Sequence, residues 1–179
     1  MGNTNKNLHN AKRAKNDEFY TLYKDIEKEM RHYDFSGLTV CCPCNDGERS
    51  NFYKYFSDNF ESLGLKRLIC VAYNREGGTS YYFDNGERKE LQGDGDFRSE
   101  EVIDLIKQAD VIITNPPFSL WREFFDLLQK YNKKFCILGN INSITYKNVF
   151  PYIKENKLWL GYELRNTSCN FEVPDDYEN

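Results

Sequence analysis

Several features are missing from this 179-residue sequence, and each absence excludes a class of protein. No apolar run approaches the roughly 18 residues that a membrane-spanning helix needs, and the polar N-terminus carries no signal-peptide core. We therefore expect a soluble, cytoplasmic protein with no membrane partner. Basic residues are not in excess either, because the net charge is −4 and the sequence pI is near 5.3. Any contact with nucleic acid must therefore depend on local basic clusters.

The spacing of a zinc finger is also missing. Cys41 and Cys44 form a C-x-x-C pair, but no second pair of cysteines or histidines follows at the spacing of a zinc site, so we expect no metal. Four of the six cysteines lie in or beside apolar runs, where a reduced thiol behaves as a small hydrophobic side chain. Reduced core thiols are the prediction, and a redox pair is the alternative.

The most informative stretch of the chain is residues 109–119. Three β-branched residues, 111–113, predict a short buried strand, which must stop at the two prolines because proline has no N–H to continue a ladder. Such a strand delivers Asn115 to a sheet edge, where its side-chain carbonyl lies beside the proline carbonyls and the ring of Phe118. The group is suited to holding a planar amine.

Strands alternate with helices along most of the chain. We predict strands at 38–42, 68–72, 111–113 and 134–138, and helices at 17–33, 50–63, 99–108, 120–131 and 146–156. This alternation indicates an α/β fold with a doubly wound parallel sheet and right-handed crossovers. The Asn85-Gly86 turn between two strand-like runs predicts an inserted hairpin. Length favours one domain over residues 17–179, preceded by an arm at 1–16.

The loops after the predicted strands give weak signals by themselves. The loop at 43–47 lacks the G-x-G-x-x-G fingerprint, so an ordinary βα turn explains it as well as a nucleotide site does. The second strand ends in Tyr73 and Asn74 rather than in an acidic residue for a ribose. The turn at 93–97 holds two aspartates that could receive the polar edge of an adenosine, with Phe97 packing on its ring. Loop and cap chemistry would explain the same residues.

Basic residues concentrate in the N-terminal arm. The densest cluster consists of Lys6, Lys12, Arg13 and Lys15. A solvated arm and a contact with nucleic-acid phosphates explain this cluster equally well.

Taken in order, these motifs resemble those of the amino-group DNA methyltransferases. Residues 15–21 resemble the N-terminal motif that binds S-adenosylmethionine (AdoMet), 44–47 stand at motif I, 95–97 at motif III and 115–118 at motif IV. The runs at 50–52, 139–142 and 144–147 make the chain more closely similar to the EcoRI-type adenine methyltransferases.

The resemblance implies a Rossmann-like class I AdoMet-dependent methyltransferase sheet with helices on both faces. It also implies that the last strands are lacking, because members of the family run beyond residue 179. The implied cofactor is AdoMet, and the implied partner is double-stranded DNA, in which a flipped adenine is methylated on N6 within a restriction-modification system. We expect a monomer, or an oligomer if C-terminal strands are missing. The family's motifs assign catalysis to Asn115, Pro116, Pro117 and Phe118, and AdoMet binding to Phe19, Tyr20, Thr21, Cys44, Asn45, Asp46, Asp96, Phe97 and Asn115.

The chemistry explains why these residue types are needed. An exocyclic amine of adenine is a poor nucleophile, so acceptors from Asn115 and the Pro116 carbonyl would take its N–H bonds and aim its lone pair at the methyl carbon. No strong base is needed before transfer, and no histidine stands near these motifs. A base that has left the duplex would stack on Phe118.

Other functions stay open at this point. Cytosine N4 and a protein glutamine amide also present planar amines. A non-catalytic or incomplete methyltransferase-fold module that binds DNA or a partner is the alternative from another class, and a zinc module is a distant third.

Overall fold

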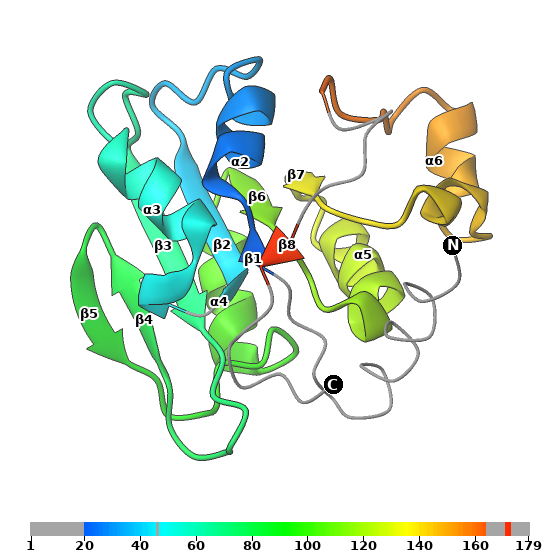
Figure 1. Ribbon diagram of the computed structural model, residues 1–179. Coiled ribbons are helices and arrows are strands. Elements are labelled where there is room, and N and C mark those ends of the chain that lie inside the picture. Colours follow the sequence, from blue (N-terminus) through cyan, green and yellow to red (C-terminus); the bar gives the residue numbers. More distant parts are fainter. Residues whose placement is uncertain (1–19, 46, 164–170, 173–179) are drawn as a thin grey trace.

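The computed structural model describes residues 20–45, 47–163 and 171–172. Its centre is a six-stranded sheet with the order β5-β4-β3-β2-β6-β7 (Figure 1). The strands of this sheet are β2 (Thr39–Asn45), β3 (Arg67–Ala72), β4 (Tyr81–Asp84), β5 (Glu87–Glu90), β6 (Val111–Thr114) and β7 (Lys134–Ile137). The helices are α2 (Tyr23–Met30), α3 (Asn51–Asp58), α4 (Glu100–Gln108), α5 (Trp121–Lys130) and α6 (Phe150–Lys154), with 3-10 turns η1 (Gly47–Arg49), η2 (Phe118–Leu120) and η3 (Ile141–Thr145). A separate antiparallel pair joins β1 (Tyr20–Thr21) to β8 (Phe171–Glu172).

Helices cover both faces of the sheet, as predicted. Because side chains alternate along a strand, Val40 and Cys42 of β2 pack in the cluster that holds α2 and α3, whereas Cys41 packs with α4 and α5. The same alternation continues in β6, where Ile113 belongs to the first cluster and Ile112 to the second. The α/β prediction is therefore confirmed, with two cores separated by one sheet.

The four strands predicted for the parallel sheet do pair in parallel, and the added hairpin makes the whole sheet mixed. Strands β3, β2, β6 and β7 are parallel, but β4 and β5 run antiparallel to their neighbours. The predicted hairpin is confirmed, with Asn85 (φ 52°) and Gly86 (φ 85°) in the left-handed region that a tight two-residue turn requires. It extends the main sheet instead of standing apart from it, because β4 pairs with β3.

Several predicted boundaries were wrong, and α3, predicted to reach residue 63, ends at Asp58. Strand β2 continues through Pro43 to Asn45, where the pairing with β3 shifts register, and such an irregularity is where a strand tolerates proline. The first helix begins at Tyr23 because Tyr20–Thr21 is a strand. The helix expected at 146–156 is the short α6, preceded by η3.

The cysteines behave as core side chains. Cys41, Cys42 and Cys70 are fully buried free thiols, which confirms the prediction for them. Burial raises the pKa of Cys41 to about 12. No disulfide joins the described cysteines, so Cys41 and Cys44 are not paired.

Two features are absent from the described ranges, 20–45, 47–163 and 171–172. These ranges contain no group of three His, Cys, Asp or Glu side chains placed to hold a metal ion. Within the same ranges, no helix combines the length and apolarity needed to cross a membrane. The predicted arm at 1–16 lies outside the described residues.

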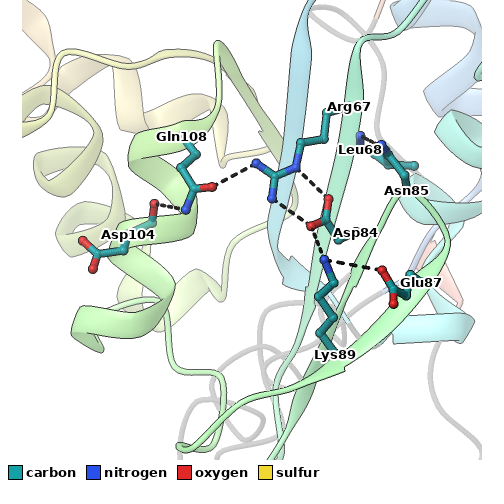
Figure 2. Close-up of polar contacts among 8 residues, drawn as sticks. All are labelled: Arg67, Leu68, Asp84, Asn85, Glu87, Lys89, Asp104 and Gln108. Atoms are coloured by element: carbon teal, nitrogen blue, oxygen red, sulfur yellow. Dashed lines mark hydrogen bonds and ion pairs between the residues drawn. The ribbon is translucent and has the colours of Figure 1, made fainter.

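A polar network, drawn in Figure 2, joins the amino end of β3 to the carboxyl end of β4. Arg67 donates from Nε and Nη2 to the two carboxylate oxygens of Asp84, at 2.6 and 2.9 Å, and from Nη1 to Gln108 Oε1 of α4 at 2.9 Å. Lys89 of β5 donates to Asp84 at 2.8 Å. The hairpin is thereby fixed both to the sheet and to a helix.

A second polar contact ties α2 to residues 161–163. The buried carboxylate of Glu29 accepts the main-chain N–H groups of Tyr162 (2.8 Å) and Glu163 (2.7 Å) and the hydroxyl of Tyr33 (2.6 Å). A Cβ atom on Gly161 would lie 2.6 Å from Glu29 Oε1, so this close approach requires glycine.

Replacing Asp84 tests the first network. The hydrogen bonds from Arg67 lower the pKa of Asp84 to about 2, against a reference of 3.8, so the ionised carboxylate stabilises the fold above about pH 4 and loses that contribution as pH falls through 2. We expect Asp84→Asn to lower the free energy of unfolding by about 2 kcal/mol at pH 7, because one pKa unit is about 1.4 kcal/mol. Urea titrations at pH 7 and pH 2 measure the difference.

The control is Glu90→Gln, which removes an exposed partner of Arg88 and should change stability little. If Asp84→Asn lowers the free energy of unfolding as much at pH 2 as at pH 7, the stabilisation does not come from an ion pair.

Candidate active site

The parallel strands end at one edge of the sheet, and hydrogen bonds join the loops that leave it. Tyr73 N donates to Asn45 O (3.2 Å), which links the ends of β3 and β2. Leu138 N donates to Thr114 O (3.2 Å), which links the ends of β7 and β6. The carboxyl edge of a parallel sheet is where α/β folds bind ligands.

A buried polar network crosses from β2 to β6 at this edge. Ser50 Oγ donates to Asn45 Oδ1 at 2.8 Å, and Asn45 Nδ2 makes a longer contact of 3.5 Å with Thr114 Oγ1. All three side chains are at most 8% exposed. Because Thr114 directly precedes Asn115, this network fixes where the predicted catalytic residue leaves the sheet.

Strand β1 reaches the same edge through α3. Asn51, at the start of α3, donates from Nδ2 to Thr21 O at 2.8 Å. Thr21 is 3% exposed, and its buried Oγ1 has no hydrogen-bond partner within the described part of the chain. A buried hydroxyl without a partner is costly, so this atom is a candidate contact for a ligand.

The turn at 93–97 closes over the end of β3. Asn74 N donates to Asp94 O at 2.7 Å, and Gly95 (φ 84°) lies so close to the Ala72 carbonyl that a Cβ atom would collide with it. Arg98 forms an ion pair with Asp96, in which Arg98 Nε donates to Asp96 Oδ1 at 2.9 Å. The hydrogen bonds from Arg98 lower the pKa of Asp96. Asp96 therefore stands at the edge as an ionised acceptor.

Phe97 is a core residue. Its ring is 4% exposed and packs edge-on against Phe124 of α5, with ring centroids 5.0 Å apart. The ring packs in the core cluster of α4 and α5, which leaves little of it exposed for an adenosine, and cofactor binding by Phe97 stays a prediction. An aromatic side chain two residues before a helix N-cap can turn inward in this way when a facing helix offers an apolar surface.

The four residues after β6 form the centre of the site. Asn115 is partly buried and its Oδ1 is fully buried, while Pro116 is buried. Pro117 and Phe118 are partly exposed, and Leu120 N donates to Pro117 O (3.0 Å) as the chain turns into η2. The prolines thus end the strand, as the sequence indicated.

The loop after β7 is anchored next to this segment. Trp121 Nε1 donates to Leu138 O at 2.7 Å, and a Cβ atom on Gly139 would lie 2.6 Å from that nitrogen. Tyr146 contacts the same indole edge-on, with ring centroids 6.1 Å apart. The loop at 139–145 is therefore fixed against the start of α5.

The structure brings many of the predicted site residues to one edge. Hydrogen bonds of these residues or of their chain neighbours place Tyr20–Thr21, Asn45, Asp96 and Asn115 at this edge. Cys44 is partly buried and packs against the core cluster of α4 and α5. Phe19 and Asp46 lie outside the described residues.

Sequence reasoning missed Ser50, Asn51 and Thr114 as parts of the site. Ser50 carried a usable signal, because a serine immediately before a helix is a common N-cap, and it does cap α3 by accepting from Tyr53 N. Thr114 carried none, since a buried threonine in a strand is ordinary.

Removing the Ser50 hydroxyl tests the network. We expect Ser50→Ala to lower the free energy of unfolding by about 2–3 kcal/mol, because it removes a helix cap and leaves the buried Asn45 carbonyl oxygen without this donor. Ser99→Ala is the matched control, since Ser99 caps α4 through Val102 N and has no buried side-chain network, so about 1 kcal/mol is expected. Guanidinium titrations give both values, and equal losses would show that the network adds nothing.

Comparison with known proteins identifies the family of this chain. The family model described as adenine-specific methyltransferase EcoRI matches residues 7–90 and 76–179. Among curated proteins, the chain is similar to the type II methyltransferase M.EcoRI of Escherichia coli, with 50% identity over 98% of this chain. It is also similar to M.MpnI of Mycoplasma pneumoniae (45%) and M.MgeORF184P of Mycoplasma genitalium (44%), each over 94% of this chain.

The match does not extend over the whole of these relatives. The chain spans 61% of the length of M.EcoRI and 54% of each mycoplasma protein. No solved structure matches the chain.

Proposed function

Because this chain belongs to the EcoRI family of adenine-specific methyltransferases, we propose that it transfers a methyl group from AdoMet to N6 of an adenine in double-stranded DNA. The observation that carries the proposal is the convergence of Asn115 with Thr21, Asn45 and Asp96 at one sheet edge. Two halves of a site meet there. One offers polar groups for a nucleoside, and the other offers acceptors for an amine.

The residues of the first half fit AdoMet. Thr21 Oγ1 is a buried hydroxyl that needs a partner, and Asp96 is an ionised acceptor for the polar edge of an adenosine. Asn45 adds a main-chain segment at the end of β2, where cofactors bind in folds of this type. AdoMet, when bound, supplies an electrophilic methyl group.

The second half acts on the amine. Asn115 Oδ1 and the Pro116 carbonyl are two acceptors on consecutive residues, and proline fixes the backbone between them. Accepting both N–H bonds of an adenine amine concentrates its lone pair on nitrogen and directs it along the line of transfer. The new C–N bond would form as the methyl–sulfur bond of the cofactor breaks, with S-adenosylhomocysteine as the leaving group. The methylated amine would then release its proton to solvent, so no strong base has to be present beforehand.

The target base has to leave the duplex to reach these acceptors. Phe118 begins η2 three residues after Asn115 and keeps part of its surface exposed, so its ring can stack on a base. Stacking on an aromatic ring is worth roughly 1–3 kcal/mol per base and offsets part of the unstacking cost.

Replacing Asn115 is the direct test. We expect Asn115→Ala to keep most of its AdoMet affinity, which the other cofactor residues supply, but to lose methyl transfer by about 100-fold or more, as removal of a preorganised polar group from a reacting centre does. Transfer of a tritiated methyl group to plasmid DNA measures activity, and N6-methyladenine in the digested product identifies the acceptor.

Asn148→Ala is the control, because the Asn148 side chain donates to Asp126 Oδ1 at 2.8 Å in an exposed hydrogen bond and lies on the segment before α6. Full activity in Asn115→Ala would contradict the catalytic assignment. A product methylated on cytosine or on protein would contradict the acceptor but leave the site chemistry standing.

Replacing Asp96 tests the cofactor half. We expect Asp96→Asn to weaken AdoMet binding about tenfold or more, because a hydrogen bond to a charged group is worth about 1.5–3 kcal/mol. Asp104→Asn, on the exposed face of α4, should bind AdoMet normally. Isothermal calorimetry measures both, and absence of heat with the unmodified protein would favour a non-catalytic module instead.

Other parts of the proposal concern the whole protein. A monomer that works in the cytoplasm, a single catalytic domain over 17–179 and phosphate contacts by the arm at 1–16 all stay predictions. A series of gel shifts against salt concentration tests the last of them.

A further inference from the structure

We propose that Ile141 is a wedge that enters the DNA base stack when the target adenine leaves it. The inference rests on the proposed function and assigns a role to a residue outside the acceptors and the cofactor half. Enzymes that act on a flipped base have to break stacking on both sides of it, and inserted apolar side chains are a common means of doing so.

Ile141 lies at the carboxyl edge of the parallel strands, where the proposed site is. It opens η3, three residues after Leu138, whose N–H donates to Thr114 O at 3.2 Å. Asn115 follows Thr114 directly, so the loop that carries Ile141 leaves the sheet beside the proposed acceptor. The anchoring of this loop on Trp121 keeps it there.

The exposure of Ile141 is unusual for this edge. Six large hydrophobic side chains in the described residues are well exposed: Tyr73, Ile141, Phe150, Trp159, Leu160 and Tyr162. Four of them lie on α6 or in residues 159–162. Only Tyr73 and Ile141 follow the ends of the parallel strands.

These two residues lie on opposite sides of the site. Tyr73 follows β3, on the cofactor side of β2, whereas Ile141 follows β7, on the far side of β6. The strand order β3-β2-β6-β7 therefore leaves one large apolar side chain, 53% exposed, on the side where the target base has to arrive.

The turn that presents Ile141 is held by its own hydrogen bonds. Asn140 Oδ1 accepts from Asn142 N at 2.9 Å, and Asn140 O accepts from Ser143 N at 2.8 Å, so the backbone is fastened on both sides of Ile141. Thr145 Oγ1 donates to Asn142 O at 2.8 Å. A β-branched side chain on a fixed backbone has few rotamers to lose, which lowers the entropic cost of insertion.

The test compares a normal target with one that is already unpaired. After the methylated adenine has been mapped by sequencing plasmid DNA treated with the protein, two duplexes are made. One carries the adenine opposite thymine, and the other carries it opposite an abasic site. We expect Ile141→Ala to lower kcat/KM about tenfold on the paired duplex, because the apolar contact of Ile141 with the neighbouring bases is lost. On the abasic duplex we expect kcat/KM to fall by less than about twofold.

Two control variants and two further measurements distinguish a wedge from other causes of lost activity. Phe150→Ala removes an equally exposed apolar side chain from α6 and should methylate both duplexes normally. Ile141→Leu keeps an apolar wedge and should retain activity on the paired duplex. Calorimetry should give the same AdoMet affinity for Ile141→Ala as for the unmodified protein, and 2-aminopurine in place of the target should fluoresce less with Ile141→Ala.

The wedge is overturned if Ile141→Ala methylates the paired duplex at the normal rate, or if it loses equally on both duplexes. Those results leave the proposed function intact, because the unmodified protein still methylates adenine. If the unmodified protein places no N6-methyladenine in plasmid DNA, the proposed function fails, and the wedge fails with it.

Discussion

The buried polar contact between β2 and β6 is the constraint on which the site depends. Asn45, Ser50 and Thr114 are excluded from water, so each has to find its partners inside the protein or lower its stability. The same contact joins the first strand unit to the strand that precedes Asn115. Residues that hold a nucleoside and residues that hold an amine are thus set in one frame before either ligand arrives, which is what positioning catalysis requires.

Much of the fold follows from local pattern. Residues 68–72 and 111–113 are continuous apolar runs, as expected for central parallel strands, and the Asn85-Gly86 turn identifies the hairpin by chemistry that few other residues allow. The end of β6 was equally predictable, because two consecutive prolines supply no N–H to continue the ladder. These features depend on residues adjacent in sequence, and the pattern records such interactions directly.

Other features depend on partners far along the chain. The hairpin joins the main sheet because Arg67 donates to Asp84 and β4 pairs with the edge of β3. The local sequence pattern of the hairpin does not predict this pairing. Phe97 turned inward because α5 offers Phe124 on the facing surface. Pro43 remains inside a strand because the ladder shifts register around it. In each case tertiary contact decided between conformations that the local sequence allowed.

The contact of Glu29 with residues 162 and 163 has a consequence for the order in which the chain is made. The carboxylate and its main-chain donors are up to 134 residues apart, so a ribosome that adds about 5–20 residues per second needs roughly 7–27 s to supply them. Until then the carboxylate of Glu29 lacks these two main-chain donors. The segment that begins beside the cofactor half of the site is therefore among the last to reach its final position during synthesis.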